Sequence, residues 1–364
     1  MKILILSDDF PPKSFGGAGI IASIQAQELQ KRGHEVNVFT ITDDKDKIDS
    51  RFRSYLSLYN IKTIKKIKKI LKEFKPDIVH VHNIHEHISY ASLYYAKKSG
   101  AKVFITLHDA MSVYYGKVPQ NYINTDNPIS LIDCFKTFGI RVNPFRNLII
   151  RKLFNYADKI FVVSEALGRF LSNNGIKNTI VMHNGINTNN WRVPDIIKNE
   201  YKKSLGINND TKIVMIAGRL NNMKGAKVSL KAFAEVLKKY RNVVLLIVGN
   251  KPEQNNEFNS IINQLNIVDK VIFTGWVRYE NMPTVYSISD IVIVPSLYLD
   301  PFPTINLEAM ASKKPVIGTK FGGTPEIIKN GNNGYIIDPN NIEQFKNKIL
   351  DLLNDEQLTI NMGK

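Results

Sequence analysis

The residues best suited to chemistry in this 364-residue chain follow short apolar runs, where buried strands of a sheet would end. Arg219 comes directly after the apolar run 213–217, and Lys224 follows where a helical pattern begins. Two fixed cations beside a helix N-terminus suit a diphosphate, whose charge must be stabilised as it leaves. A solvated surface pair is the alternative, but a strand-end arginine beside Gly218 and Gly225 favours a binding role.

Two carboxylates stand close together in the stretch 295–328. Asp300 precedes a predicted helix that begins near Thr304, and Glu308 lies inside that helix. Pro303, directly before the helix, leaves the free amides of the first turn available to a ligand. Because a carboxylate accepts hydrogen bonds from paired hydroxyls, Glu308 suits a ribose and Asp300 suits a hexose.

A glycine-rich loop follows the first predicted strand. Gly16, Gly17 and Gly19 lie where a helix begins, and free backbone amides at such a point can face an anion. The glycines come too late after the strand, and with the wrong spacing, for the dinucleotide-binding fingerprint. A flexible loop before a helix is the alternative interpretation.

Four histidines fall within residues 80–87 and raise the question of a metal site, since imidazole is the commonest metal ligand. These are His80, His82, His85 and His87. No cysteine joins them, and their spacing matches no defined zinc motif. We therefore expect no metal here, and we expect His80 and His82 to end a buried strand.

The elements that must position these residues are visible as apolar runs that alternate with helical patterns, which is typical of parallel sheets covered by helices. Strands are predicted at 3–6, 36–41, 78–82, 103–107, 160–163 and 179–182, and in a second series at 213–217, 243–248, 271–274, 291–294 and 315–317. The polar, proline-containing segment 186–195 between the two series is the predicted linker. The sequence thus predicts an α/β fold of two facing, doubly wound, Rossmann-like domains, 1–185 and 196–364.

Such a fold also predicts where a ligand binds. In open parallel sheets, ligands lie beyond the carboxyl ends of the strands. Two facing domains would form a deep cleft lined by strand-end loops, so the residues that follow strands are the expected site.

The composition is that of a globular protein. Hydrophobic residues make up 43% of the chain, and no apolar run approaches the roughly 18 residues that a membrane-spanning helix needs. The N-terminal apolar run is too short for a signal peptide, and the single cysteine, Cys134, fits a reducing cytoplasm. The net charge of +16 suits nucleic acid, anionic lipid or phosphorylated ligands, but no nucleic-acid-binding signature is present.

Two further segments allow more than one interpretation. In the segment 60–76, lysines surround an apolar helix face formed by Ile61, Ile64, Ile67, Leu71 and Phe74. We expect a covering helix, whose lysine-rich side also suits an anionic membrane surface. Residues 110–146 are rich in aromatic side chains and are expected to be irregular. A loop of this length suits recognition of a second substrate, and a surface flap is the alternative.

Several motifs together resemble the family 4 glycosyltransferases. They are the glycine loop at 16–19, PDIVHVHN at 76–83, TLHD at 106–109, VVSE at 162–165, HNGIN at 183–187, GRLNNMKG at 218–225 and the stretch 295–328. The resemblance extends along nearly the whole chain. It implies the two-domain fold called GT-B and retention of anomeric configuration.

The resemblance also implies roles by position. Arg219 and Lys224 would bind the diphosphate, Glu308 the ribose, and His108 the transferred sugar. The catalytic set would be His108, Asp300, Arg219 and Lys224. The donor-binding set would add Gly16, Gly17, Phe302, Pro303, Thr304 and Glu308. Backbone amides around 302–304 would lie near the phosphate and sugar, although Pro303 has no N–H to donate. Apart from the resemblance, we expect His85 and His87 to line the acceptor side and the long loop after His108 to recognise the acceptor.

Two departures from the family pattern stand out. The family has glutamate at both ends of its E-x7-E motif, whereas the first position here is Asp300, which keeps the charge but shortens the reach by one methylene. Similar proteins also continue into C-terminal helices that cross back to the first domain. We expect this connection to be missing from the sequence that ends at Lys364.

The expected activity is transfer of a hexose-type sugar from a nucleoside diphosphate sugar to a saccharide or lipid-linked acceptor. It would need no metal or other cofactor and would serve the synthesis of a cell-surface polysaccharide. The alternatives are a sugar-nucleotide epimerase or phosphorylase of the same fold, and a non-catalytic scaffold that binds sugar nucleotides. The expected location is the cytoplasm, with peripheral contact on the inner face of the membrane as a further option.

Overall fold

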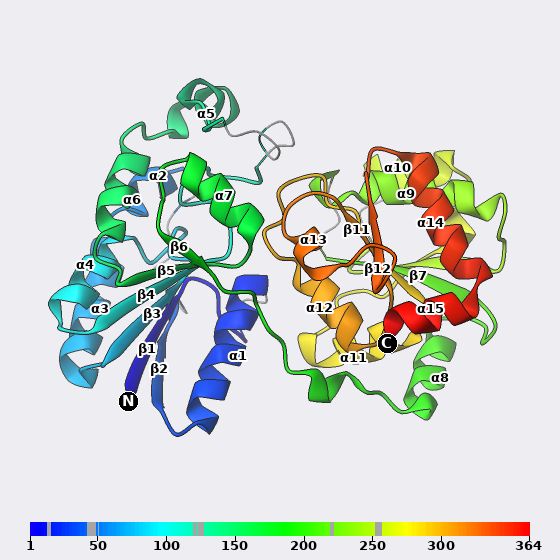
Figure 1. Cartoon of the computed structure of the whole chain (residues 1–364), viewed down its shortest axis with the longest axis horizontal. Coiled ribbons are helices and arrows are strands. Elements are labelled where there is room, and N and C mark those ends of the chain that lie inside the picture. Colours follow the sequence, from blue (N-terminus) through cyan, green and yellow to red (C-terminus); the bar gives the residue numbers. More distant parts are fainter. Residues whose placement is uncertain are drawn as a thin grey trace. The chain divides into compact units, whose positions relative to one another are not determined.

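The chain divides into two compact units, Met1–Gly185 and Ile186–Lys364, in the computed structural model (Figure 1). The structure describes residues 1–12, 16–41, 49, 51–118, 122, 127–218, 222–251 and 257–364. The division falls at the residue where the expected linker begins. Each unit is built on its own sheet of six parallel strands.

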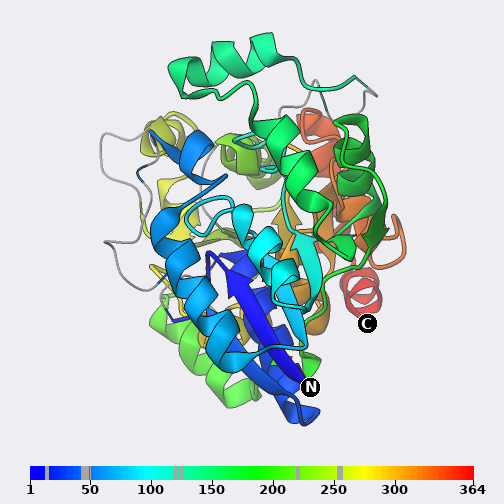
Figure 2. The ribbon, with the colours of Figure 1, turned by 90° about the vertical axis from the view of Figure 1, so that its left-hand side faces the viewer.

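The first unit has the strand order β2-β1-β3-β4-β5-β6. Its strands are β1 (Lys2–Ser7), β2 (Glu35–Phe39), β3 (Ile78–His82), β4 (Lys102–Leu107), β5 (Lys159–Val162) and β6 (Thr179–Val181). Its helices are α1 (Gly17–Lys31), α2 (Arg53–Leu56), α3 (Ile61–Phe74), α4 (Ala91–Lys98), α5 (Leu131–Phe138), α6 (Arg146–Phe154) and α7 (Glu165–Asn173). Helices α3, α4 and α6 lie on one face of the sheet, and α1 and α7 lie on the other (Figures 1 and 2).

The second unit has the strand order β12-β11-β10-β7-β8-β9. Its strands are β7 (Lys212–Ala217), β8 (Val243–Val248), β9 (Val271–Phe273), β10 (Ile291–Val294), β11 (Val316–Thr319) and β12 (Gly334–Ile337). Its helices are α8 (Asp195–Ser204), α9 (Ala226–Leu237), α10 (Glu257–Gln264), α11 (Met282–Ile288), α12 (Thr304–Ala311), α13 (Thr324–Ile327), α14 (Ile342–Asn354) and α15 (Glu356–Gly363). The eleven predicted strands are confirmed to within a few residues, and β12 is an additional edge strand.

Burial on both faces explains why the central strands read as continuous apolar runs. All six residues of β8 are buried, as are five of the six in β1 and in β7. Helices α9, α10 and α14 bury their apolar side chains with the strands in one core cluster that includes Phe233, Phe258 and Phe345. Removing this apolar surface from water is the main stabilising term of such a domain.

Helix α3 has the covering role expected for the lysine-rich segment. Ile64, Ile67 and Leu71 are buried against the unit, and the side chain of Asn60 caps the helix by accepting from the Lys62 amide. The lysines of the opposite face, Lys65, Lys66, Lys68, Lys69 and Lys72, are exposed. Among the described residues, no helix has both the length and the apolar character needed to cross a membrane.

The predicted linker packs against the second unit. It contains a short 3-10 turn, Thr188–Trp191, and the indole of Trp191 is buried. The Trp191 ring meets the edge of Tyr286 at 5.5 Å and of Tyr279 at 6.3 Å between ring centroids. The middle of this segment is therefore fixed to α11 and to the turn before it.

Each sheet has one point at which the strand order reverses. In the first sheet β1 lies between β2 and β3, and in the second β7 lies between β8 and β10. Helices that follow the two neighbouring strands leave on opposite faces at such a point, and this opens a crevice at the carboxyl ends of the strands. The fold therefore directs attention to the ends of β1 and β3 in one unit, and of β7 and β10 in the other.

Candidate functional site

Lys224 and Asp300 meet at the reversal point of the second sheet. Lys224 ends the 3-10 turn that follows β7, and Asp300 lies in the loop after β10. Lys224 Nζ lies 2.5 Å from Asp300 Oδ2, and Ser296 Oγ donates to the same oxygen at 3.0 Å. The turn can approach the loop this closely because residue 225 is glycine: a Cβ there would lie 2.1 Å from the Pro295 carbonyl oxygen.

The Lys224–Asp300 pair is largely withdrawn from water. The Asp300 side chain is 7% exposed and that of Lys224 is 23% exposed. Burial opposes the charge on Lys224, but Asp300 and the nearby Tyr298 outweigh it, so the Lys224 pKa is raised. The ammonium also lies 5.2 Å from the Tyr298 ring centroid. The site therefore holds a permanent cation whose charge is balanced by one carboxylate.

The backbone of Asp300 is held by the loop that follows β11. The Gly323 amide donates to the Asp300 carbonyl oxygen at 2.9 Å. Gly322 has a φ of 69°, and a Cβ there would lie 2.1 Å from that oxygen. Only glycine fits both requirements, so this loop fixes the position of Asp300.

Glu308 is buried in α12, one helical segment after Asp300. Its Oε2 accepts from the Tyr286 hydroxyl at 2.7 Å, and that tyrosine lies on α11. Burial raises the pKa of Glu308, while the hydrogen bond from Tyr286 acts in the opposite direction. The structure thus adds Tyr286 to the site. The sequence could not predict this residue, because nothing in the sequence marks a tyrosine 22 residues away as the partner of Glu308.

Helix α12 begins at the residue predicted from the sequence. Pro303 is its N-cap residue and Thr304 is its first residue, while Phe302 is buried beside them. Among the predicted donor-binding residues, the structure gathers Lys224, Asp300 and the start of α12 at the end of β7 and β10. Arg219 lies outside the described residues, so its role stays a prediction.

An exposed tryptophan lies at the same edge of the second sheet and was not identified from the sequence. Trp276 follows β9 in the loop after Phe273, and the residue is 67% exposed. Strand β9 is two positions from β7 in the sheet, which corresponds to roughly 10 Å. Its exposed aromatic ring offers a surface on which a flat ligand group can stack.

In the first unit, Gly16 and Gly17 begin α1. Gly16 is the N-cap residue and has no side chain with which to cap the helix. A Cβ at Gly16 would lie 3.1 Å from Asp9 Oδ2, and one at Gly19 would lie 2.7 Å from the Asp9 carbonyl oxygen. The glycines therefore let the helix pack closely against the end of β1, a packing role that stands beside the predicted anion contact.

The ends of β3 and β4 bring three histidines together. His82 Nδ1 lies 2.9 Å from His108 Nε2, and His82 Nε2 lies 2.7 Å from Gln25 Oε1 of α1. His80 Nε2 lies 2.8 Å from Thr106 Oγ1, and its ring stacks on His82 at 4.4 Å between centroids. Burial lowers the pKa of His80 to about 4 and of His108 to about 3, and it holds the pKa of His82 well below its ordinary value.

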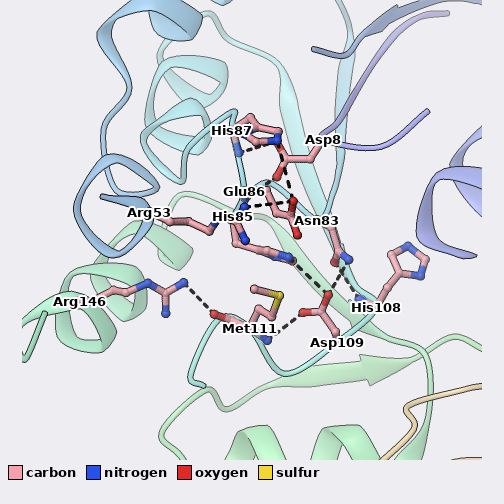
Figure 3. A network of polar contacts seen from close by, with 10 residues as sticks. All are labelled: Asp8, Arg53, Asn83, His85, Glu86, His87, His108, Asp109, Met111 and Arg146. Carbon is pink, nitrogen blue, oxygen red and sulfur yellow. Dashed lines mark hydrogen bonds and ion pairs between the residues drawn. The ribbon is translucent and has the colours of Figure 1, made fainter. Parts of the chain in front are cut away.

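Asp8 is the anchor of the loop that follows β3. Its buried carboxylate accepts the amides of Glu86 at 2.6 Å, His87 at 3.1 Å and Ile88 at 2.7 Å, as Figure 3 shows in part. Burial raises the pKa of Asp8 to about 7, against the opposing effects of nearby His85 and these amides. The carboxylate therefore shapes the strand-end loop from inside the unit.

Asp109 connects this loop to His108 (Figure 3). Its Oδ2 accepts from Asn83 Nδ2 at 2.8 Å and lies 3.5 Å from His85 Nε2. The His108 amide in turn donates to Asn83 Oδ1 at 3.2 Å. The side chains of residues 83, 85 and 109 thus hold the backbone that carries His108.

The histidines are separated by this arrangement. His80 and His82 lie in the buried strand β3, as predicted, whereas His85 and His87 lie in the loop that follows. Within the described part of the chain, no group of three or more His, Cys, Asp or Glu side chains is placed to hold a metal ion.

The prediction that residues 110–146 are irregular is wrong in part. They contain helix α5 and a 3-10 turn, Gly139–Arg141, while residues 119–121 and 123–126 lie outside the described ranges. Helix α5 has the apolar spacing of an amphipathic helix, but the many aromatic residues of the segment led to the prediction of an irregular loop. Its side chains Leu131, Ile132 and Phe135 are exposed, and the helix projects away from the sheet (Figures 1 and 2).

Comparisons with known proteins match both halves of the chain. The family model described as Glycosyltransferase Family 4 matches residues 15–190, and the one described as Glycosyl transferases group 1 matches residues 197–364. Spore coat protein SA of Bacillus subtilis (strain 168) is 26% identical and covers 100% of this chain and 93% of its own. The N-acetyl-alpha-D-glucosaminyl L-malate synthase of Bacillus anthracis is 25% identical, and the match covers 100% of this chain and 91% of the synthase.

The fold also has solved relatives. Anabaena Alr3699/HepE in complex with UDP-glucose matches with a TM-score of 0.69 at 21% identity, covering 100% of this chain and 92% of that chain. At this level of identity the likeness concerns the fold. It confirms the predicted pair of Rossmann-like domains.

Proposed function

Because the chain belongs to the family 4 glycosyltransferases of the GT-B type, we propose that it transfers a hexose-type sugar from a nucleoside diphosphate sugar to a saccharide or lipid-linked acceptor. The transfer retains the anomeric configuration, needs no metal and serves the synthesis of a cell-surface polysaccharide.

The observation that carries this proposal is the Lys224–Asp300 pair at the end of β7 and β10. A leaving diphosphate needs a cation that is already in place, and Lys224 is such a cation. Asp300 holds the ammonium while the site is empty and offers a carboxylate to sugar hydroxyls when the donor is bound. The amides at the start of α12 supply further hydrogen-bond donors beside the pair.

The other parts of the donor fit neighbouring residues of the second unit. The Glu308 carboxylate, oriented by Tyr286, suits the paired hydroxyls of a ribose. Trp276 suits the nucleobase, because an exposed indole gives a stacking surface of the right kind. The HepE structure contains UDP-glucose, which supports a uridine diphosphate sugar as the first donor to test.

The handling of the proton follows from the retaining chemistry that the family resemblance implies. In a retaining transfer, the bond between the anomeric carbon and the diphosphate breaks while the acceptor oxygen bonds to the same face of the carbon. The leaving phosphate oxygen takes the proton of the acceptor hydroxyl, so no side chain has to act as the base. His108, a neutral imidazole in the first unit, contacts the transferred sugar.

We also propose a peripheral contact with an anionic membrane surface through the first unit. The exposed apolar side chains of α5 are accompanied on the α6 side by Phe145, Leu148 and Ile149, and basic residues lie among them. Such a mixture suits the interface of an anionic bilayer, where a lipid-linked acceptor would be found.

A panel of nucleoside diphosphate sugars tests the function. The purified chain is incubated with each sugar nucleotide and a mixture of saccharide and lipid-linked acceptors, with and without a chelator. Formation of a glycoside that persists with chelator supports the proposal. An isomerised donor would indicate an epimerase, binding without turnover would indicate a scaffold, and strict dependence on a divalent ion would reject the metal-free mechanism.

A further inference from the structure

Three side chains in the first unit form a linear hydrogen-bonded chain that ends at His108. Gln25 projects from α1, His82 ends β3, and His108 follows β4. The contacts are 2.7 Å from Gln25 Oε1 to His82 Nε2 and 2.9 Å from His82 Nδ1 to His108 Nε2. The two imidazole planes are inclined by only 22° with centroids 5.2 Å apart, which is the separation reached when two rings meet edge to edge through a nitrogen–nitrogen contact.

The chemistry of the first member sets the direction of every hydrogen bond in the chain. An amide oxygen can only accept, so His82 Nε2 must carry the proton. A neutral imidazole has a single N–H, so His82 Nδ1 is then an acceptor. The proton between the two rings therefore belongs to His108 Nε2, and the remaining nitrogen of His108, Nδ1, carries a lone pair.

The surroundings keep both rings neutral, so this order is not disturbed by protonation. His80 stacks on His82, and burial together with the neighbouring imidazoles disfavours a second proton on either ring. His82 is 1% exposed, whereas His108 is partly exposed and is the member of the chain able to meet a ligand. No described residue hydrogen-bonds to His108 Nδ1.

We propose that Gln25 and His82 are positioning residues that hold His108 as its Nε2–H tautomer and present Nδ1 as a hydrogen-bond acceptor to the transferred sugar. This inference rests on the proposed function in one respect only, namely that His108 contacts that sugar. It narrows the donor to a neutral hexose that offers a hydroxyl hydrogen at the contacted position. A sugar with a carboxylate there is excluded, because two acceptors would face each other without a proton between them.

The first arm of the test observes the tautomer without any substrate. Long-range 1H–15N spectra of the whole chain labelled at histidine nitrogen, assigned with a His108→Asn variant, distinguish a protonated from an unprotonated ring nitrogen. We expect His108 to be protonated at Nε2 and bare at Nδ1. A proton at Nδ1 would overturn the proposal, because Gln25 would then be oriented with its amide nitrogen toward His82.

The second arm uses one substitution to reverse the direction of the hydrogen bonds that join Gln25, His82 and His108. Gln25→Lys replaces the acceptor by a donor, so His82 should become the Nδ1–H tautomer and His108 should follow. Gln25→Glu is the matched control, since it keeps an acceptor oxygen and should leave both tautomers unchanged. A thermal melt shows whether the Gln25→Lys variant is folded. If the folded variant keeps the wild-type tautomer of His108, Gln25 does not set that tautomer and the proposal is rejected.

The third arm measures donor choice. With the sugar nucleotide that the panel identifies, kcat/KM for the neutral hexose should exceed that for the corresponding hexuronic acid by on the order of 100-fold or more, since a site built around a hydroxyl rejects an analogue that lacks it. Gln25→Lys should reduce this ratio at least tenfold, whereas a purely structural defect would lower both values alike. Equal use of the two sugars by the wild type would overturn the specificity claim. A complete absence of turnover would count against the proposed function. The spectra would still show whether Gln25 and His82 set the tautomer of His108.

Discussion

The ammonium of Lys224 and the carboxylate of Asp300 lie 2.5 Å apart at the point where the second sheet reverses its strand order. The pair joins two loops that are 76 residues apart in the sequence. The ion pair lies in a poorly hydrated position, and the pKa of Lys224 is raised, so the ammonium keeps its charge there. A donor that carries two phosphates would find a cation and a hydroxyl acceptor already oriented, which is the condition for strong electrostatic stabilisation of a leaving group.

Removing the cation should therefore affect both activity and stability. Lys224→Ala should lower kcat by about 10²–10³, as loss of one preorganised contact does, and it should destabilise the fold by about 3 kcal/mol because Asp300 is left buried without its partner. Initial rates and urea unfolding measure the two effects.

The double variant Lys224→Met/Asp300→Leu is the control for the Lys224 prediction. It removes both charges, so stability should return towards that of the wild type while activity stays lost. If Lys224→Ala turned over at the wild-type rate, the leaving-group role would be wrong. We expect Arg219→Ala to lose activity in the same way.

Trp276→Ala should weaken binding of the nucleotide without affecting the fold. Stacking of a base on an aromatic side chain contributes about 1–3 kcal/mol, so Kd for the nucleoside diphosphate should rise by about tenfold or more. Because Trp276 is 67% exposed, the melting temperature should change little. Trp276→Phe should restore most of the affinity. Calorimetry measures Kd for the three proteins, and equal affinities would contradict the stacking role of Trp276.

Asp8 should make stability depend on pH in a direction opposite to that of an ordinary carboxylate. Its pKa of about 7 in the folded state exceeds the ordinary 3.8, so between these values the folded chain binds more protons than the unfolded chain. The Asp8 contribution to the free energy of unfolding should therefore be full below about pH 4 and decline up to about pH 7, by at most about 1.4 kcal/mol per pH unit.

The buried histidines act in the reverse sense, because their lowered pKa values make stability rise with pH up to about 6.5. The informative quantity is consequently the difference between the wild type and Asp8→Asn, measured by urea unfolding at several pH values. This difference should decrease steadily from pH 4 to 7. A constant difference would mean that Asp8 is ionised throughout this range.

Membrane contact should depend on apolar and basic residues of the first unit together. Ile132→Ser/Phe135→Ser should reduce sedimentation with anionic vesicles because it weakens insertion of α5. Replacing the lysines at 65, 66, 68 and 69 by glutamate should reduce sedimentation through charge, since each lysine contributes up to about 1 kcal/mol near such a surface. Neutral vesicles are the control for both. Undiminished sedimentation of both variants would leave α3 with its covering role and remove the proposed contact.

Most of the framework could be predicted from the sequence because buried parallel strands are continuous apolar runs. The edge strand β12 escaped because GYII is short and begins with a glycine. Helix α12 was placed correctly since Pro303 marks its start. Single strand-end residues such as Lys224 and Asp300 could be chosen for the same reason: strand ends of a doubly wound sheet converge.

What could not be predicted are the partners of these residues. Gln25 and His82 are 57 residues apart, and Tyr286 reaches Glu308 from a different helix. Such pairs depend on how helices pack on the sheet, which periodicity in one segment does not encode. Trp276 was overlooked because exposure, which makes it notable, is a property of the folded chain.

The configuration of the product tests the central claim most directly. An NMR spectrum of the first-formed glycoside, recorded during turnover of the donor found in the panel, reads the anomeric centre before any exchange. A retained configuration, formed with a chelator present, is the result predicted for a family 4 glycosyltransferase that relies on Lys224, Asp300 and His108. An inverted product, or one that forms only with a divalent ion, would contradict the account.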